Sequence, residues 1–143
     1  MWKTFTPVLL TAGLLVLSCD QLEDKPQLLE SLAHSQWEVT GYLPPGTPEP
    51  KVSPVPYQLT FINDSTFILQ LDINRLVGKY SATQGGGFSV REIKRTDNCC
   101  DSEYALQMAE IVQSANVFQS TKEGIALQGS GEVFLKKKIT ENP

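Results

Sequence analysis

Two adjacent cysteines, Cys99 and Cys100, are the residues of this chain best suited to chemistry. They precede a predicted helix, whose positive N-terminal end lowers the pKa of a nearby thiol and favours the nucleophilic thiolate. Asp97, Asp101 and Glu103 stand close in sequence and oppose that effect. A disulfide between neighbours is strained, because consecutive Cα atoms lie about 3.8 Å apart whereas ordinary disulfides need about 4.4 to 6.8 Å. Three interpretations stay open: structural thiols, a vicinal or intermolecular disulfide, and a thiol site for redox or metal chemistry.

The sequence offers little else for metal binding or acid-base catalysis. A zinc site needs three or four His, Cys or carboxylate ligands, and the single histidine, His34, is far from Cys99 and Cys100. Ser-His-Asp and Cys-His schemes would both have to use His34, which has no local signature around it. The carboxylates that remain are explained equally well as turn caps and solvated strand faces: Asp64, Asp72 and Asp97. We expect no enzyme activity, no metal and no cofactor.

The third cysteine, Cys19, ends a short apolar leader. Lys3 gives the chain a positive start, and residues 7–17 form an apolar run, a pattern typical of a secretory signal peptide. The run is roughly a dozen residues long, fewer than the roughly 20 that a spanning helix needs. Residues 15–19 (LVLSC) resemble a bacterial lipobox, in which the peptidase cuts before the cysteine. We therefore predict that residues 1–18 are a lipoprotein signal peptide; the alternative is that Cys19 is a buried structural cysteine.

Lipid on Cys19 would anchor the mature protein to a membrane. The thioether carries a diacylglyceryl group and the freed amine takes a further acyl chain such as palmitate; two or three chains anchor stably where one does not. Residues 19–28 form a polar tether. Asp directly after the cysteine retains lipoproteins at the inner membrane in some bacteria, whereas acidic clusters there direct surface export in others. We expect a cell-envelope location, at the outer membrane (periplasmic or surface face) rather than the inner.

The charge of the mature chain disfavours nucleic acid as a partner. Without residues 1–18 the chain has 11 basic and 16 acidic residues, a formal charge of −5. The one dense basic run, at residues 136–138, has no interleaved arginine and aromatic residues of the kind that bind nucleic acid. This run is most simply explained as a solvated strand end or as an edge guard, since lysines at a strand edge discourage aggregation through that edge.

From Gln36 onward, most of the chain alternates apolar and polar residues, the pattern of half-buried strands. The apolar positions of three predicted strands are Trp37, Val39 and Gly41; Tyr57, Leu59 and Phe61; and Phe67, Leu69, Leu71 and Ile73. Residues 63–65 (NDS) predict a hairpin turn between the second and third of these strands. Residues 43–56 contain six prolines, so they cannot join an inner ladder. We expect a surface excursion there, or alternatively a docking loop for a partner.

The second half of the sequence predicts more strands and one helix. Residues 78–82 and 88–93 are strand candidates joined by a glycine turn, and residues 116–121, 124–128 and 132–138 complete the chain. Asp101 is placed to cap the helix, whose apolar positions recur at helical spacing: Tyr104, Met108, Ile111 and Val112. The aromatic residues assigned to the core are Trp37, Phe61, Phe67, Tyr80, Phe88 and Phe134.

The order of several short segments carries a family resemblance. They are residues 35–39 (SQWEV), 59–61 (LTF), 74–80 (NRLVGKY), 96–100 (TDNCC), 124–127 (GIAL) and 133–135 (VFL). Together they resemble the META domain of HslJ-type bacterial lipoproteins and periplasmic proteins, over residues 29–138, with a short tail at 139–143. Many members have a cysteine just before the Asn of the N-x-x-x-G segment; Ile73 stands there instead, which removes the obvious disulfide partner. The resemblance implies a compact β-rich module without a common catalytic site, linked in some members to heat shock, drug tolerance or secretion.

These observations predict an α+β fold, mainly β: an antiparallel, barrel-like sheet of about seven to eight strands with one packed α-helix. The predicted function is that of a lipid-anchored, non-catalytic envelope protein that binds an unknown protein or envelope component, as an interaction or stress-tolerance module. One alternative is a lipocalin-like carrier of a small apolar ligand, since barrels of about eight strands can enclose one. The other is a thiol redox protein using Cys99 and Cys100.

Overall fold

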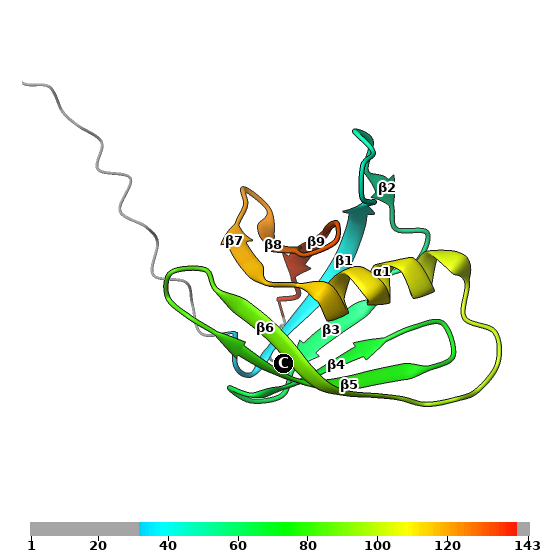
Figure 1. The fold of residues 1–143 in the computed structure, drawn as a ribbon, viewed down its shortest axis with the longest axis horizontal. Coiled ribbons are helices and arrows are strands. Elements are labelled where there is room, and N and C mark those ends of the chain that lie inside the picture. The colour runs from blue at the N-terminus through cyan, green and yellow to red at the C-terminus, as the bar shows by residue number, and fades with distance from the viewer. Residues whose placement is uncertain (1–31, 140–143) are drawn as a thin grey trace, which may run out of the picture.

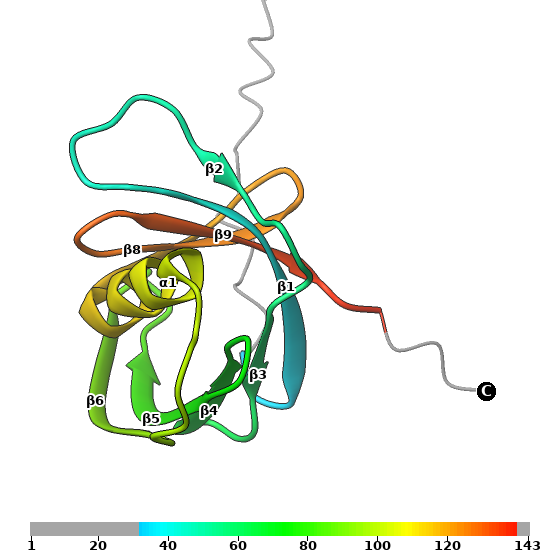
Figure 2. The ribbon, with the colours of Figure 1, turned by 90° about the vertical axis from the view of Figure 1, so that its right-hand side faces the viewer.

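The alternating segments pair into one antiparallel sheet that curls into a half-barrel (Figures 1 and 2). The structure is a computed structural model and describes residues 32–139. Its strands are β1 (Ser35–Leu43), β2 (Lys51–Val52), β3 (Gln58–Phe61), β4 (Thr66–Gln70), β5 (Arg75–Ala82), β6 (Phe88–Arg95), β7 (Val117–Ser120), β8 (Gly124–Gln128) and β9 (Glu132–Lys137). Eight of them follow the order β6-β5-β4-β3-β1-β9-β8-β7, and β2 pairs with β1 alone. The predicted fold class is confirmed.

The two end strands of the sheet meet at one corner. Phe88 N donates to Asn116 O at 2.9 Å and Phe118 N donates to Gly86 O at 2.8 Å. Beyond this corner, helix α1 (Glu103–Ser114) lies between β6 on one side and β8 and β9 on the other, as Figure 2 shows. The face that α1 turns inward is apolar and comprises Ala105, Met108, Ala109, Ile111 and Val112. The helix thus completes the wall that the sheet leaves open.

Aromatic and aliphatic side chains fill the interior of the half-barrel. Phe61 contacts the ring of Tyr80 with centroids 4.8 Å apart, and Phe88 packs on Tyr80 and on Phe118. Fully buried large side chains include Tyr42, Phe61, Phe67, Leu69 and Met108. Within residues 32–139, no helix is long and apolar enough to cross a membrane.

In two of the predicted strands, the alternation of inward and outward side chains ends earlier than the sequence indicated. A β-bulge between Val39 and Gly41 changes the face of β1, so that Tyr42 lies in the core while Gly41 lies under β2. A Cβ atom on Gly41 would come within 2.6 Å of Lys51 O, so only glycine allows β2 this close. The predicted third strand is too long at Ile73, which is 52% exposed, because Leu71 N bonds Asn74 O and closes a turn.

The proline-containing excursion lies on the outside of the sheet, as predicted. Only Lys51 and Val52 pair, opposite Tyr42 and Gly41 of β1, and both are exposed. The signal peptide, Cys19 and the whole tether of residues 19–28 lie outside the described residues. Of the tail at 139–143 only Ile139 is described, and it is 84% exposed.

Candidate functional site

A polar cluster fixes the end of the half-barrel where the β4–β5 turn meets the loop before α1. At its centre is Asn74, which is only 3% exposed. Its side-chain nitrogen Nδ2 donates to Asn98 O at 2.6 Å and to Asp101 Oδ2 at 2.7 Å. Its Oδ1 accepts from Thr96 Oγ1 and from Asn98 N, each at 2.8 Å. One amide side chain therefore makes four hydrogen bonds and joins two segments more than 20 residues apart.

Asp101 is a second link between these segments, and the predicted helix cap is wrong. Its Oδ1 accepts from the backbone nitrogens of Ile73 and Asn74 at 2.9 and 3.1 Å. The cap is Ser102, whose Oγ accepts from Ala105 N at 3.2 Å. Burial raises the pKa of Asp101, but the hydrogen bonds from Ile73 and Asn74 outweigh it and hold this pKa below its ordinary value. The Asp101 carboxylate thus accepts hydrogen bonds from the β4–β5 turn and does not cap the helix.

Asp72 ties the same turn to the start of the helix. Its Oδ2 accepts from Ser102 N at 2.7 Å, and its Oδ1 accepts from the Tyr57 hydroxyl at 2.7 Å. Burial acts to raise the pKa of Asp72, yet the hydrogen bonds from Ser102 and Tyr57 lower it overall. For Tyr57, burial raises the pKa of the phenol. The hydrogen bond from the Tyr57 hydroxyl to the Asp72 carboxylate therefore holds the residue before β3 next to the β4–β5 turn.

Cys99 and Cys100 lie on the loop that this cluster holds, and their sulfur atoms are bonded to each other. Their Cα atoms are 3.7 Å apart, and Cys100 has a φ of 92°, a left-handed conformation uncommon for residues other than glycine. Both residues are exposed. A thiolate from solution can therefore reach the disulfide, and attack of a thiolate on one of the sulfur atoms is the first step of thiol–disulfide exchange.

Of the other residues considered for catalysis, Asp97 lies on this loop, whereas His34 and Asp64 are not brought to it. Ser35 pairs with Phe61, so His34 lies at the Phe61 end of β3, whereas Tyr57 and its partner Asp72 lie at the other end. Asp64 lies in the β3–β4 turn, where Asn63 Oδ1 accepts from Ser65 N as the predicted hairpin requires. Among residues 32–139, no group of three His, Cys, Asp or Glu side chains is placed to hold a metal ion.

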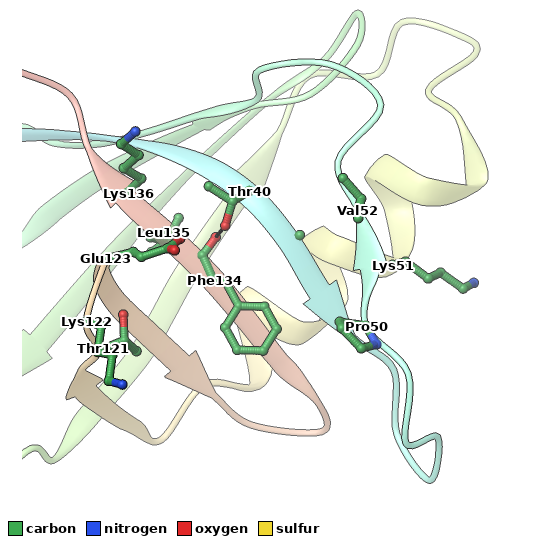
Figure 3. A pocket seen from close by; sticks show the side chains of 11 residues that line it. Thr40, Pro50, Lys51, Val52, Thr121, Lys122, Glu123, Phe134, Leu135 and Lys136 are labelled. Carbon is green, nitrogen blue, oxygen red and sulfur yellow. Dashed lines mark hydrogen bonds between the residues drawn. The ribbon is translucent and has the colours of Figure 1, made fainter.

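A second candidate site is a groove on the outer face of the sheet (Figure 3). Its volume is about 410 Å³. Its floor is formed by β1 and β9, where Thr40 Oγ1 donates to Phe134 O at 3.3 Å. One wall is Pro50 and Val52 of the excursion; the other is the β7–β8 turn. The residues of that turn that line the groove are Thr121, Lys122 and Glu123.

Phe134 is the large apolar side chain on the floor of this groove, and its assignment to the core is wrong. Its neighbours Val133 and Leu135 are buried, so strand alternation turns Phe134 outward, where it is half-buried. Val52, on the wall, is 81% exposed. Phe134 on the floor and Val52 on the wall lie on either side of Gly41 of β1, and together they form the apolar strip of the groove.

The basic residues around the groove differ in direction. Lys51 points away from Phe134 in Figure 3, and its Nζ lies 3.3 Å from Gln107 Oε1 and 5.6 Å from the centre of the Tyr42 ring. Lys122, Glu123 and Lys136 lie at the opposite wall and the upper end. The rim is therefore polar and of mixed charge around an apolar floor, as in protein interfaces.

Sequence reasoning missed the two side chains on which these sites depend. Asn74 was noticed only as part of the N-x-x-x-G segment, whose Gly78 is needed because a Cβ there would lie 2.5 Å from the Phe67 ring. Nothing local revealed that Asn74 would be buried. For Phe134, the alternation Val-Phe-Leu within residues 133–135 was a usable signal, because one of the three had to face outward.

Comparison with known proteins identifies the fold and no family. The sequence matches no known protein-family profile and no curated protein. The structure is similar to an NMR structure of a protein from Burkholderia xenovorans, with a TM-score of 0.58 over 76% of this chain and 85% of that one. The two sequences are 13% identical, so the similarity extends to the fold alone. The chain is thus a β-rich half-barrel that resembles a bacterial protein structure.

Proposed function

We propose that this protein is a lipid-anchored, non-catalytic module of the bacterial cell envelope that binds an extended polypeptide in the groove between β2 and the β7–β8 turn. The observation that carries the proposal is the outward Phe134 on the floor of a walled groove. An exposed apolar strip with a polar rim is typical of an interaction site. The sequence resemblance to META domains of HslJ type supports the same kind of role.

The shape of the groove favours an extended segment. The β1 and β9 strands form a floor that runs along the groove, and two protruding loops confine it laterally (Figure 3). The wall of residues 43–56 contains six prolines, which fix φ and limit the entropy that binding would cost. A rigid wall next to an aromatic floor suits a chain with apolar side chains on one side.

The membrane anchor is the second part of the proposal. Cys19 would carry the lipid and residues 19–28 would serve as the tether, placing the domain at the outer membrane. Intact-mass measurement of the protein extracted from membranes tests this part. A mass equal to residues 19–143 plus a diacylglyceryl group and a further acyl chain supports it, whereas a chain that retains residues 1–18 contradicts it.

Site-specific photocrosslinking tests the groove. A photoreactive amino acid at Val52 or Thr121, on the two walls, should give one defined polypeptide adduct in intact cells. The same amino acid at Ser89, on the outer face of β6, is the control. The Phe134→Ala variant should lose the adduct at both wall positions, while Phe134→Leu, which keeps an apolar floor, should retain part of it.

Two outcomes would contradict the groove proposal. Equal adducts at Val52, Thr121 and Ser89 would indicate contact without a preferred surface. An adduct unchanged in Phe134→Ala would mean that the floor does not contribute. Circular dichroism of Phe134→Ala must match that of the parent, which separates loss of the floor from loss of the fold.

The accessible disulfide supports thiol exchange as a second candidate function. Attack of a substrate thiolate on Cys99 or Cys100 would form a mixed disulfide and release the other cysteine as a thiolate. Reduction of insulin by a dithiol provides the assay. The double variant Cys99→Ser with Cys100→Ser should abolish any acceleration; an equal rate with the parent and the variant would reject this function.

The carrier alternative receives no comparable support. Side chains from the sheet and from α1 occupy the interior, where Tyr42, Phe61 and Met108 are each less than 2% exposed. A lipocalin-like carrier needs that space for its ligand.

A further inference from the structure

The β5–β6 hairpin assembles a basic face that no run of the sequence reveals. On β5, the buried Leu76, Gly78 and Tyr80 alternate with the outward residues Arg75, Val77 and Lys79. On β6, Arg91 pairs with Lys79 and Lys94 pairs with Val77. Residues directly opposite each other in an antiparallel pair share a face. The basic face is defined by Arg75, Lys79, Arg91 and Lys94.

The β-bulge in β6 is what aligns these charges. The register shifts between Val77 and Lys79, so that Glu92 and Ile93 together face Gly78. Glu92 has a φ of 53°, and Ile93 packs against the core. Because the bulge places two residues of β6 opposite one residue of β5, Arg91 and Lys94 both remain on the outer side of the sheet. Glu92 is the one acid of β5 and β6.

Protection of a sheet edge does not explain this arrangement. Edge lysines and arginines do discourage aggregation, which would account for Arg91 and Lys94 on β6. Arg75 and Lys79, however, lie on β5, which is an inner strand between β4 and β6. Like charges directly opposite one another destabilise a sheet, and Lys79 and Arg91 are such a pair. The Lys79 ammonium relieves part of this repulsion by donating to Thr66 Oγ1 of β4 at 2.9 Å, and an external anion would offset the remainder.

We infer that the basic face of β5–β6 rests on a phospholipid bilayer with anionic headgroups. The inference rests on the lipid anchor of the proposed function, because the tether of residues 19–28 spans at most roughly 35 Å and keeps the domain close to the bilayer. At such short range even weak charge attraction becomes effective. Val77, half-buried, lies between Arg75 and Lys79 on the outer face of β5, and the half-buried Ile68 lies beside it on β4; the two complete a surface suited to headgroups.

This orientation has a consequence for the groove. Figure 2 shows β5 and β6 on the side of the half-barrel opposite β2 and β9. With the basic face on the bilayer, the groove opens toward the aqueous compartment. The two surfaces are therefore used at the same time, one to orient the domain and the other to bind.

Lysine footprinting tests the bilayer contact. The mature protein, extracted from membranes of a host that processes its leader, is mixed with liposomes of phosphatidylcholine alone or with phosphatidylglycerol added. An amine-reactive reagent then labels the bound protein, and mass spectrometry gives the rate at each lysine. Lys79 and Lys94 should react several-fold more slowly on the anionic liposomes. Lys51 and Lys136, on the groove side, should react at the same rate on both, and high salt should remove the difference.

Matched charge variants distinguish the face from the overall charge. Arg91→Gln with Lys94→Gln removes two cations from the basic face and should weaken its bilayer contact by roughly tenfold or more, restoring fast labelling of Lys79. Lys122→Gln with Lys138→Gln removes the same charge elsewhere and should leave the protection of Lys79 intact. Circular dichroism and the labelling of Lys51 report whether each variant is folded.

Several outcomes would overturn the inference. Equal labelling of Lys79 on neutral and anionic liposomes, or equal protection of all lysines, would exclude an oriented contact. Protection of Lys79 by soluble polyglutamate but not by anionic liposomes would assign the face to an acidic polypeptide instead. A different outcome, failure to bind neutral liposomes at all, would contradict the lipid anchor of the proposed function, and labelling on the anionic liposomes would still decide whether the basic face contacts the bilayer.

Discussion

The disulfide loop and the outer groove are both exposed, yet they are held in place in different ways. Around the loop, Asn74, Asp101 and Asp72 make hydrogen bonds to specific backbone and side-chain atoms. Around the groove, the walls are joined to the rest mainly through strand pairing, as where β2 meets β1. The polar groups around the loop form hydrogen bonds with one another, whereas the groove has an exposed apolar side chain, Val52, on its wall. Residues at the loop should therefore control stability, and residues at the groove should control binding.

Substitution of Asn74 tests this contrast with the largest expected effect. Asn74→Ala removes four hydrogen bonds and leaves buried donors and acceptors without partners. The free energy of unfolding should therefore fall by about 3 kcal/mol or more. Urea denaturation followed by the fluorescence of the buried Trp37 measures it. The control is Asn98→Ala, because Asn98 contributes backbone atoms alone to the cluster. If both variants lose the same stability, the side chain of Asn74 is not the centre of the region.

The acid dependence of stability tests Asp101. An Asp whose pKa is lower in the folded than in the unfolded chain stabilises the fold at pH values above its unfolded-state pKa, which is about 3.9. This contribution is lost as the pH falls through the folded value. The free energy of unfolding should thus decline below about pH 4 in the parent. Asp101→Asn should be less stable at neutral pH and should show a shallower decline. Asp97→Asn, which makes none of these bonds, should retain the slope of the parent.

Loss of the disulfide should cost less than loss of Asn74. A bond between neighbouring residues closes the shortest loop, so it restricts the unfolded chain little, and its removal should cost about 1 kcal/mol or less. The double variant Cys99→Ser with Cys100→Ser, compared with the parent in urea, measures it. A cost as large as that of Asn74→Ala would show that the disulfide, and not the hydrogen bonds, holds the loop.

Strand positions could be predicted from sequence because a period of two reports burial directly, and the helix because its apolar residues recur at helical spacing. The errors occurred where distant contacts override local pattern. Ser102 and not Asp101 caps the helix, because Asp101 is used by a turn 27 residues away. The bulge in β1 goes with the close approach of β2 over Gly41, which alternation alone does not reveal. The outward Phe134, in contrast, could have been recognised from the alternation within residues 133–135. The basic face likewise required the register of β5 with β6.

The smallest effect on stability is expected at Val52. Its side chain is 81% exposed and makes a wall of the groove, so Val52→Ser should change the free energy of unfolding by less than about 0.5 kcal/mol. The same substitution should weaken adduct formation from a photoreactive group at Thr121, because the apolar strip loses its second member. Val55→Ser is the matched control: Val55 is also exposed but does not line the groove. If Val52→Ser destabilises the fold as Asn74→Ala does, the groove is a structural element like the loop, and the contrast between the two regions fails.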